Sequence, residues 1–112
     1  MDITHEHADT PVAETGAESL LRGLKRNGID YIFANAGTDF PPIVEAFVHL
    51  DENEAPTPIL VPHETASVAM AHGYYLVTGR AQATMVHVNV GLANSVMGVI
   101  NAASDNIPVV VL

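Results

Sequence analysis

The stretch VPHETASVAMAHGYYLVTG, residues 61–79, determines how the rest of the chain is interpreted. An apolar segment ends here, and a helical segment follows whose first turn contains Glu64. No other charged residue occurs before Arg80, although the chain carries a formal net charge of -9. A carboxylate in a first helical turn commonly complements the helix dipole. Because ligands of parallel α/β sheets bind at the carboxyl ends of strands, Glu64 is also a candidate for chemistry.

Helical and apolar strand segments alternate along the chain. Thr15 and Glu18 form a capping-box pattern, apolar residues follow at helical spacing, and Gly28 is suited to end that helix. Asp39 is expected to cap a second helix, with two prolines in its first turn. Further helices are expected at residues 64–78 and 91–104, and strands at residues 30–35, 59–62, 83–90 and 107–112. The pattern predicts an α/β fold, a parallel sheet with helices on both faces.

Composition excludes several classes of protein. Only four residues are basic, which argues against a nucleic-acid partner. The absence of cysteine excludes disulfides and thiolate sites, and it fits a cytoplasmic protein. Residues 1–14 are acidic without an apolar core, so we expect a flexible arm and not a signal peptide. Residues 81–104 are uncharged, but their five Gln, His and Asn side chains argue against a membrane span.

No metal site is expected. A helical zinc protease needs a second histidine four residues after His63, and that position holds Ser67. His5 and His7 flank Glu6, but one short arm supplies too few rigid ligands, so a solvated tail is the better interpretation.

Two features indicate contacts beyond this chain. The helix at residues 64–78 is apolar on every side, which predicts burial on every side, and its small residues (Ala66, Ala69 and Gly73, followed by Val77) suggest the close approach of a second subunit. Residues 109–112 would leave a hydrophobic strand uncovered. We therefore expect a fold that is incomplete at the C-terminus and belongs to a longer polypeptide.

Three runs carry a family resemblance: GIDYIFANAGT (residues 28–38), VPHETASVAMAHGYYLVTGRA (residues 61–81) and HVNVGLANSVMGVINAASDNIPVVVL (residues 87–112). On these runs the chain resembles the N-terminal, pyrimidine-binding domain of thiamine-diphosphate enzymes of the acetolactate synthase and 2-keto-acid decarboxylase group. The resemblance implies the thiamine-diphosphate-binding fold, with residues 15–112 forming the N-terminal part of such a domain. It also implies decarboxylation of a 2-keto acid or acetolactate-type carboligation, by a homodimer or homotetramer.

The resemblance implies that Glu64 hydrogen-bonds a ring nitrogen of the cofactor's aminopyrimidine and so promotes removal of the thiazolium C2 proton. Gly91 and Asn94 match the Gly-x-x-Asn segment that lines the cofactor site in this family. Burial of Glu64 is expected to raise the proton affinity of its carboxyl group, which suits the sharing of a proton with the ring.

The resemblance implies roles for three further residues. Gly37 and Thr38 stand where the family's glycine loop faces the substrate. His87 stands where some decarboxylases of the group place a histidine for proton transfer. A structural histidine on a buried strand is an equally good interpretation of His87.

The resemblance implies thiamine diphosphate as cofactor, with Mg²⁺ bound by a separate C-terminal domain through a Gly-Asp-Gly motif. That motif does not occur in these 112 residues, so we expect them to be inactive alone. A flavin, which some synthases of the group bind, has no supporting motif here. Two alternatives stay open: a non-catalytic binding or assembly domain of the same fold, and a flavodoxin-like nucleotide-binding domain, for which no phosphate loop is present.

Overall fold

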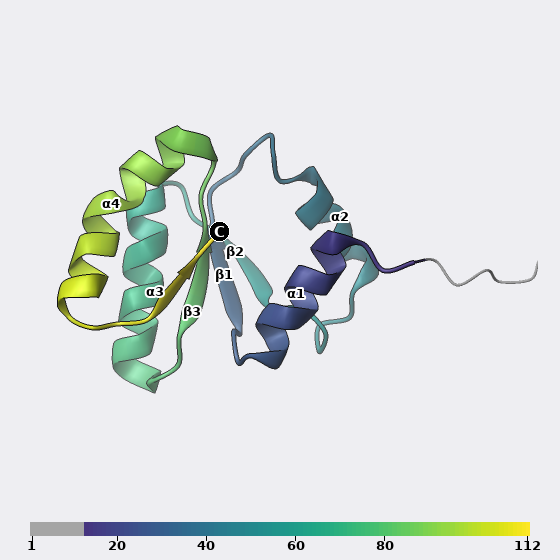
Figure 1. The fold of residues 1–112 in the computed structure, drawn as a ribbon, viewed down its shortest axis with the longest axis horizontal. Coiled ribbons are helices and arrows are strands. Elements are labelled where there is room, and N and C mark those ends of the chain that lie inside the picture. Colours follow the sequence, from purple (N-terminus) through teal and green to yellow (C-terminus); the bar gives the residue numbers. More distant parts are fainter. Residues whose placement is uncertain (1–12) are drawn as a thin grey trace, which may run out of the picture.

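A four-stranded, wholly parallel sheet forms the centre of the structure, a computed structural model that describes residues 13–112 (Figure 1). The strands are β1 (Tyr31–Ala34), β2 (Thr57–Leu60), β3 (Gln82–Met85) and β4 (Val109–Val111), in the spatial order β2-β1-β3-β4. Ile32 of β1 pairs with Pro58 of β2 on one side and with Ala83 of β3 on the other. The predicted parallel sheet is confirmed.

Helices cover both faces of this sheet, as predicted. The helices α1 (Gly16–Arg26) and α2 (Pro41–His49) lie on one face, and α3 (Glu64–Thr78) and α4 (Val88–Ser104) lie on the other (Figure 1). Successive residues of a strand point to opposite faces. Ile32 accordingly packs with Leu21 of α1, whereas Phe33 packs with Ala71 of α3. Apolar side chains on both faces of β1 therefore hold the two helical layers against one sheet.

The start of α1 follows the capping-box prediction. The Thr15 hydroxyl accepts a hydrogen bond from the Glu18 backbone at 3.2 Å, and the Glu18 carboxylate accepts one from the Thr15 backbone at 2.8 Å. Gly28 follows the C-cap Asn27 with a φ of 83°, a left-handed conformation that glycine adopts without steric cost.

Several predicted boundaries are wrong. The second strand was expected at residues 59–62 and lies at Thr57–Leu60. The third strand was expected to continue to Val90, but it ends at Met85 and α4 begins at Val88. The valines after His87 resemble a strand by composition, yet tertiary packing outweighs local propensity and places them in the first turn of the helix.

The prediction that Asp39 caps the second helix is also wrong. The N-cap residue of α2 is Phe40, and no side chain forms the cap hydrogen bond. The Asp39 carboxylate instead contacts a residue 48 positions along the chain. Both prolines do occupy the first turn of α2, as expected.

Within this chain α3 is not buried on every side, so that expectation is wrong for the chain alone. Its buried residues, Glu64, Ser67, Val68 and Ala71, face the sheet and α4, while Val77 is 86% exposed. Within residues 13–112 the helix packs against the sheet and α4, and apolar side chains on its remaining sides, among them Leu76 and Val77, are exposed. The contact with a second subunit stays a prediction.

No helix among residues 13–112 is both long and apolar enough to cross a bilayer. The flexible arm predicted for residues 1–14 falls almost entirely on residues 1–12, which lie outside the described part of the chain.

Candidate functional site

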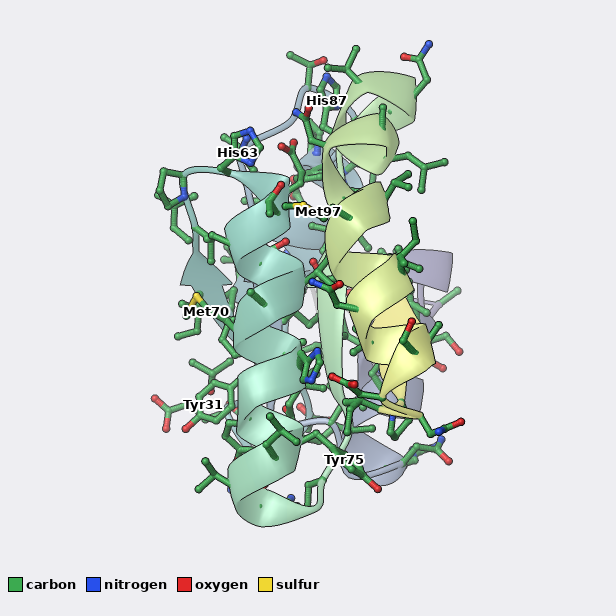
Figure 2. The ribbon with its side chains drawn as sticks, turned by 90° about the vertical axis from the view of Figure 1, so that its left-hand side faces the viewer. Tyr31, His63, Met70, Tyr75, His87 and Met97 are labelled. Atoms are coloured by element: carbon green, nitrogen blue, oxygen red, sulfur yellow. The ribbon has the colours of Figure 1, made fainter. Side chains whose placement is uncertain are left out.

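The carboxyl ends of β1, β2 and β3 bring three polar side chains to one edge of the sheet. Asn35 directly follows β1, Glu64 follows β2 after a short loop, and His87 lies between β3 and α4. Because the strands are parallel, their carboxyl ends share one edge, where ligands bind in open α/β sheets. Figure 2 shows His63 and His87 together at the end of the layer where α3 and α4 begin.

Glu64 is the most enclosed acidic residue of this edge, with a relative exposure of 5%. Its Oε1 accepts a hydrogen bond from the Asn35 side-chain amide at 3.4 Å, and its Oε2 accepts one from the Asn94 amide at 3.2 Å. The two amides come from different elements, the loop after β1 and helix α4. The carboxylate is therefore fixed in position by segments that are 29 and 30 residues away along the chain.

These contacts lower the pKa of Glu64 below its ordinary value. The hydrogen bond from its own backbone N–H has the largest effect, followed by the Asn94 amide, and together they outweigh the opposing effect of burial. Burial acts in the expected direction, but the hydrogen bonds outweigh it, so the expectation of a raised proton affinity for Glu64 is wrong for this chain. The carboxyl group is ionised at neutral pH and serves as an acceptor of hydrogen bonds.

Gly91 allows helix α4 to approach this carboxylate. A side-chain carbon at position 91 would lie 2.9 Å from Oε1 of Glu64, closer than such atoms normally approach. The structure thus brings Glu64, Gly91 and Asn94 together, as the sequence interpretation required. An ionised carboxylate has about four acceptor positions, so after two amides and its own backbone N–H Glu64 can still accept the N–H of a ring such as an aminopyrimidine.

A layer of hydroxyl groups supports the site from beneath. The Ser67 hydroxyl donates to the Glu64 carbonyl oxygen at 2.8 Å and shares a 2.6 Å hydrogen bond with the Thr84 hydroxyl of β3. Thr65 donates its hydroxyl to the Asn94 carbonyl oxygen at 2.6 Å, which ties α3 to α4. His63 is the N-cap of α3, and its Nδ1 accepts a hydrogen bond from the Thr65 backbone, which is a structural role.

A second cluster forms beside the first. Nδ1 of His87 lies 2.5 Å from a carboxylate oxygen of Asp39, and the His87 ring meets the Phe40 ring edge-on at 6.1 Å. Gly37 lies against both polar side chains. Thr38 is exposed in the adjoining turn, and its side chain makes no hydrogen bond to residues 13–112. The fold therefore brings Gly37 and His87 into contact. Thr38 is close to them only because it follows Gly37 in the sequence.

Asn35 and Asp39 are the two site residues that sequence reasoning missed. Asn35 was assigned only to the end of the first strand, although the argument from strand ends that selected Glu64 applies to it equally. Asp39 was assigned to a helix cap. The 48-residue separation from His87 leaves no local sequence signal for that pairing.

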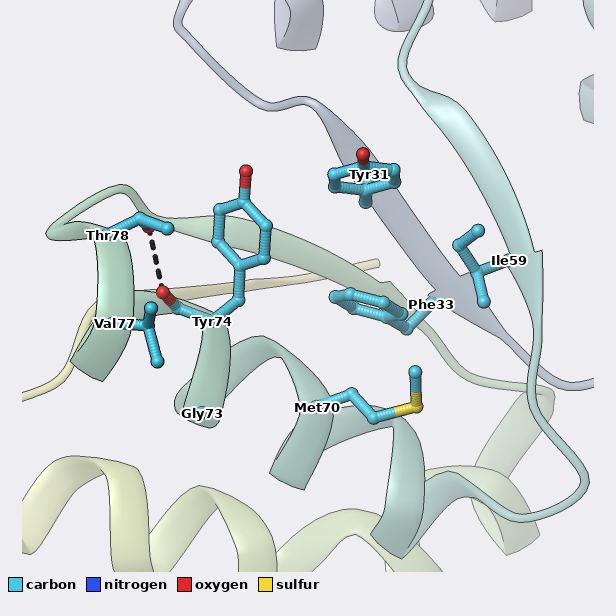
Figure 3. A pocket seen from close by; sticks show the side chains of 8 residues that line it. All are labelled: Tyr31, Phe33, Ile59, Met70, Gly73, Tyr74, Val77 and Thr78. Carbon is cyan, nitrogen blue, oxygen red and sulfur yellow. Dashed lines mark hydrogen bonds between the residues drawn. The ribbon is translucent and has the colours of Figure 1, made fainter.

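One hollow of about 530 Å³ adjoins this edge, and it is lined by Asn35, Gly37 and apolar side chains of α2 and β2. Another, of about 520 Å³, lies between α3 and the strands β1 and β2 (Figure 3). Its lining includes Tyr31, Phe33 and Met70 and no residue of the candidate site. The first hollow is the one of these two that reaches the candidate site, because Asn35 and Gly37 line it. Residues 13–112 contain no group of three or more His, Cys, Asp or Glu side chains that could hold a metal ion.

Comparisons with known proteins identify relatives of this chain. The family model described as "Thiamine pyrophosphate enzyme, N-terminal TPP binding domain" matches residues 14–112. The acetolactate synthase large subunit of Haemophilus influenzae is 34% identical over 98 residues, which are 88% of this chain and 17% of that protein. The corresponding subunit of Parasynechococcus marenigrum is 35% identical over 106 residues, which are 94% of this chain and 17% of that protein.

A solved structure of a thiamine diphosphate-dependent enzyme is also similar to this chain. The thiamine diphosphate-dependent 4-hydroxybenzoylformate decarboxylase of Rhodococcus jostii matches with a TM-score of 0.74 and 28% identity, over 87% of this chain and 18% of that chain. The chain thus spans less than a fifth of the length of these relatives.

Proposed function

The chain belongs to the thiamine pyrophosphate enzymes, in which it is an N-terminal TPP-binding domain of the acetolactate synthase type, and from this membership we propose its part in the reaction. It acts within a longer polypeptide on a 2-keto acid, by decarboxylation or by carboligation to an acetolactate-like product. Glu64 is the residue that engages the aminopyrimidine ring of the cofactor.

The single observation that carries this proposal is the placement of Glu64. Its carboxylate is almost fully enclosed and held by two amides at the carboxyl edge of the sheet. Thiamine diphosphate, when bound, supplies a carbon nucleophile and an electron sink for the keto acid. Glu64 accepts a hydrogen bond from an N–H of the pyrimidine ring, Asn94 keeps the carboxylate aligned, and Gly91 leaves the room that this alignment needs.

The second cluster supports the choice of a 2-keto acid. Gly37 borders the hollow of about 530 Å³, a volume sufficient for a small ligand. His87 lies at the same edge and takes or returns a proton during turnover. Thr38 follows Gly37 in the turn that faces the substrate. The names of the relatives support this class, because 4-hydroxybenzoylformate is itself a 2-keto acid.

Two further expectations belong to the proposal. Mg²⁺ and the diphosphate group are held by a domain outside these 112 residues, and the active enzyme is a homodimer or homotetramer. Support for an oligomer comes from the apolar side chains that α3 and α4 leave open, among them Leu76, Val77, Met97 and Ile100, each more than half exposed. The segment alone is then inactive.

The test is turnover of a panel of 2-keto acids by the complete polypeptide with thiamine diphosphate and Mg²⁺. We expect consumption of at least one keto acid, and a loss of about 10²-fold to 10⁴-fold in kcat for Glu64→Gln. Glu52→Gln is the control, because it makes the same exchange at an exposed position in the loop before β2. Near-normal turnover by Glu64→Gln would refute the role of Glu64. Failure of the wild-type polypeptide to bind the cofactor would favour the non-catalytic assembly domain.

A further inference from the structure

Asp39 and His87 join two loops at the carboxyl edge of the sheet. Asp39 lies between β1 and α2, His87 lies between β3 and α4, and their side chains meet at 2.5 Å between Oδ1 and Nδ1. Neither side chain is buried, since His87 is 31% and Asp39 45% exposed. Their alignment therefore depends on specific neighbours and not on general enclosure.

Gly37 is one of those neighbours. A side-chain carbon at position 37 would lie 2.7 Å from the Asp39 Oδ1 and 2.8 Å from the His87 Nδ1. Any other residue there would displace the two atoms that form the contact. The pair thus exists only because the loop after β1 has no side chain at this point, and the Phe40 ring packs edge-on against the imidazole from another direction.

The backbone of His87 is also well defined. His87 is the N-cap of α4, and Val88 next to it has a φ of 45°. A β-branched residue at positive φ is strained and persists only when the surrounding structure holds it in place. The imidazole therefore lies at the start of a seventeen-residue helix, and a helix holds a reacting group more rigidly than a loop does.

From these contacts we propose that Asp39 is a positioning residue for His87. Its carboxylate accepts a hydrogen bond from Nδ1–H, holds the ring in one orientation and one tautomer, and leaves Nε2 as the nitrogen that meets the substrate. The inference rests on the proposed function, because it assumes that His87 exchanges a proton with the keto acid or its product.

The chemistry follows from the donors and acceptors available. A carboxylate accepts hydrogen bonds only, so in the neutral ring its partner Nδ1 must carry the proton and Nε2 must present a lone pair. Nε2 can then take one proton and return the same proton later in the turnover, with no net change in the ring. Without the carboxylate, the neutral ring can adopt the other tautomer, in which Nε2 holds a proton and cannot accept one.

The test combines a spectrum with kinetics in the complete polypeptide. Ring nitrogens labelled with ¹⁵N report which nitrogen carries the proton, and the His87 signals are assigned by their disappearance in His87→Gln. We expect the Nδ1–H tautomer for the neutral ring of the wild type and a mixture of tautomers in Asp39→Asn. The kcat of Asp39→Asn should fall about tenfold to hundredfold with KM changed less than about threefold. Asp51→Asn, the same exchange at an exposed loop position, should change neither quantity.

Each result has a distinct meaning. An unchanged His87 spectrum in Asp39→Asn would overturn the positioning role, and so would an unchanged kcat. If the spectrum changes as expected while His87→Gln retains full turnover, Asp39 positions the ring but the proposed catalytic part of His87 is refuted. Asp39→Glu is the second variant: it restores the carboxylate, so it should return the tautomer, and a mixed population there would contradict a role for the charge.

Discussion

The carboxylate of Glu64 lies directly against the Cα of Gly91, so that a single methyl group at position 91 would stand 2.9 Å from Oε1 and 3.3 Å from Cδ. At this point of the interface α4 therefore contacts the Glu64 carboxylate of α3, the group that we propose to be catalytic. The position of α4 along α3 fixes the position of this carboxylate.

Gly91→Ala is expected to displace Glu64 while leaving most of the fold intact. The added methyl group forces the carboxylate away from the amides of Asn35 and Asn94, because its clash is with the end of a side chain. We expect a loss of at least about tenfold in kcat/KM and weaker binding of thiamine diphosphate, measured by turnover and by titration of the complete polypeptide.

The control for this variant is Gly23→Ala in α1, where a side-chain carbon meets nothing within 4 Å. It should leave activity unchanged and raise stability by about 0.5–1 kcal/mol, since alanine favours a helix over glycine. Equal activity in the Gly91 and Gly23 variants would contradict the contact between α4 and Glu64.

Gly98→Ala is expected to push α3 and α4 apart at a second contact of the same interface, further from the N-terminal ends of the two helices. A side-chain carbon at position 98 would lie 2.8 Å from the Val68 Cβ and 2.9 Å from its Cγ1, and Val68 is fully buried. We expect a loss of about 1–3 kcal/mol in stability, seen as a lower midpoint of thermal unfolding.

Val68→Ala combined with Gly98→Ala is the partly compensating variant, because it removes the Val68 Cγ1 that the new methyl group would meet at 2.9 Å and leaves only the Cβ contact. The double variant should lose less stability than the sum of the two single changes, since residues in contact are energetically coupled. Strict additivity would show that the two residues do not pack as described.

The lowered pKa of Glu64 predicts how its contribution to stability varies with pH. A carboxyl group whose pKa is lower in the folded than in the unfolded state stabilises the fold above its unfolded pKa, and this contribution is lost as the pH falls through the folded value. At pH 7 the loss of the charged acceptor in Glu64→Gln should cost about 1.5 kcal/mol.

The difference in unfolding midpoint between wild type and Glu64→Gln should therefore be largest near pH 7 and shrink as the pH falls below the ordinary pKa of 4.5 toward the lower pKa of the folded carboxyl group. Thermal unfolding across a pH series from 7 to well below 4.5 measures it. A difference that grows toward acidic pH would mean that the pKa of Glu64 is raised and not lowered.

The parallel sheet, the helices on both faces and the Glu64, Gly91 and Asn94 group could all be predicted from the sequence. Short apolar runs, a capping box and an acid placed at the end of a strand predicted the sheet, the helices and Glu64, whereas Gly91 and Asn94 were predicted through the family resemblance. The boundary at His87 could not be predicted, because Val88 and Val90 have strand propensity and only tertiary contacts place them in a helix.

The two missed residues show what local patterns omit. Asn35 and Asp39 act on partners 29 and 48 residues away, and nothing near them in sequence indicates those partners. The pKa of Glu64 was predicted in the wrong direction because burial alone was considered. The backbone N–H of Glu64 has the largest lowering effect, and the Asn94 and Asn35 amides, which add to it, become neighbours of the carboxylate only in the folded chain.

If the Glu64 carboxylate activates the bound cofactor, the exchange of the cofactor's C2 proton with deuterium depends on that carboxylate. The complete polypeptide is loaded with thiamine diphosphate and Mg²⁺, mixed with D₂O for a set time and quenched in acid, and the remaining C2 proton is measured by NMR. We predict rapid exchange on the wild type, and exchange slowed by about 10²-fold or more on Glu64→Gln at equal cofactor occupancy. Equal exchange rates on the two proteins would contradict the account.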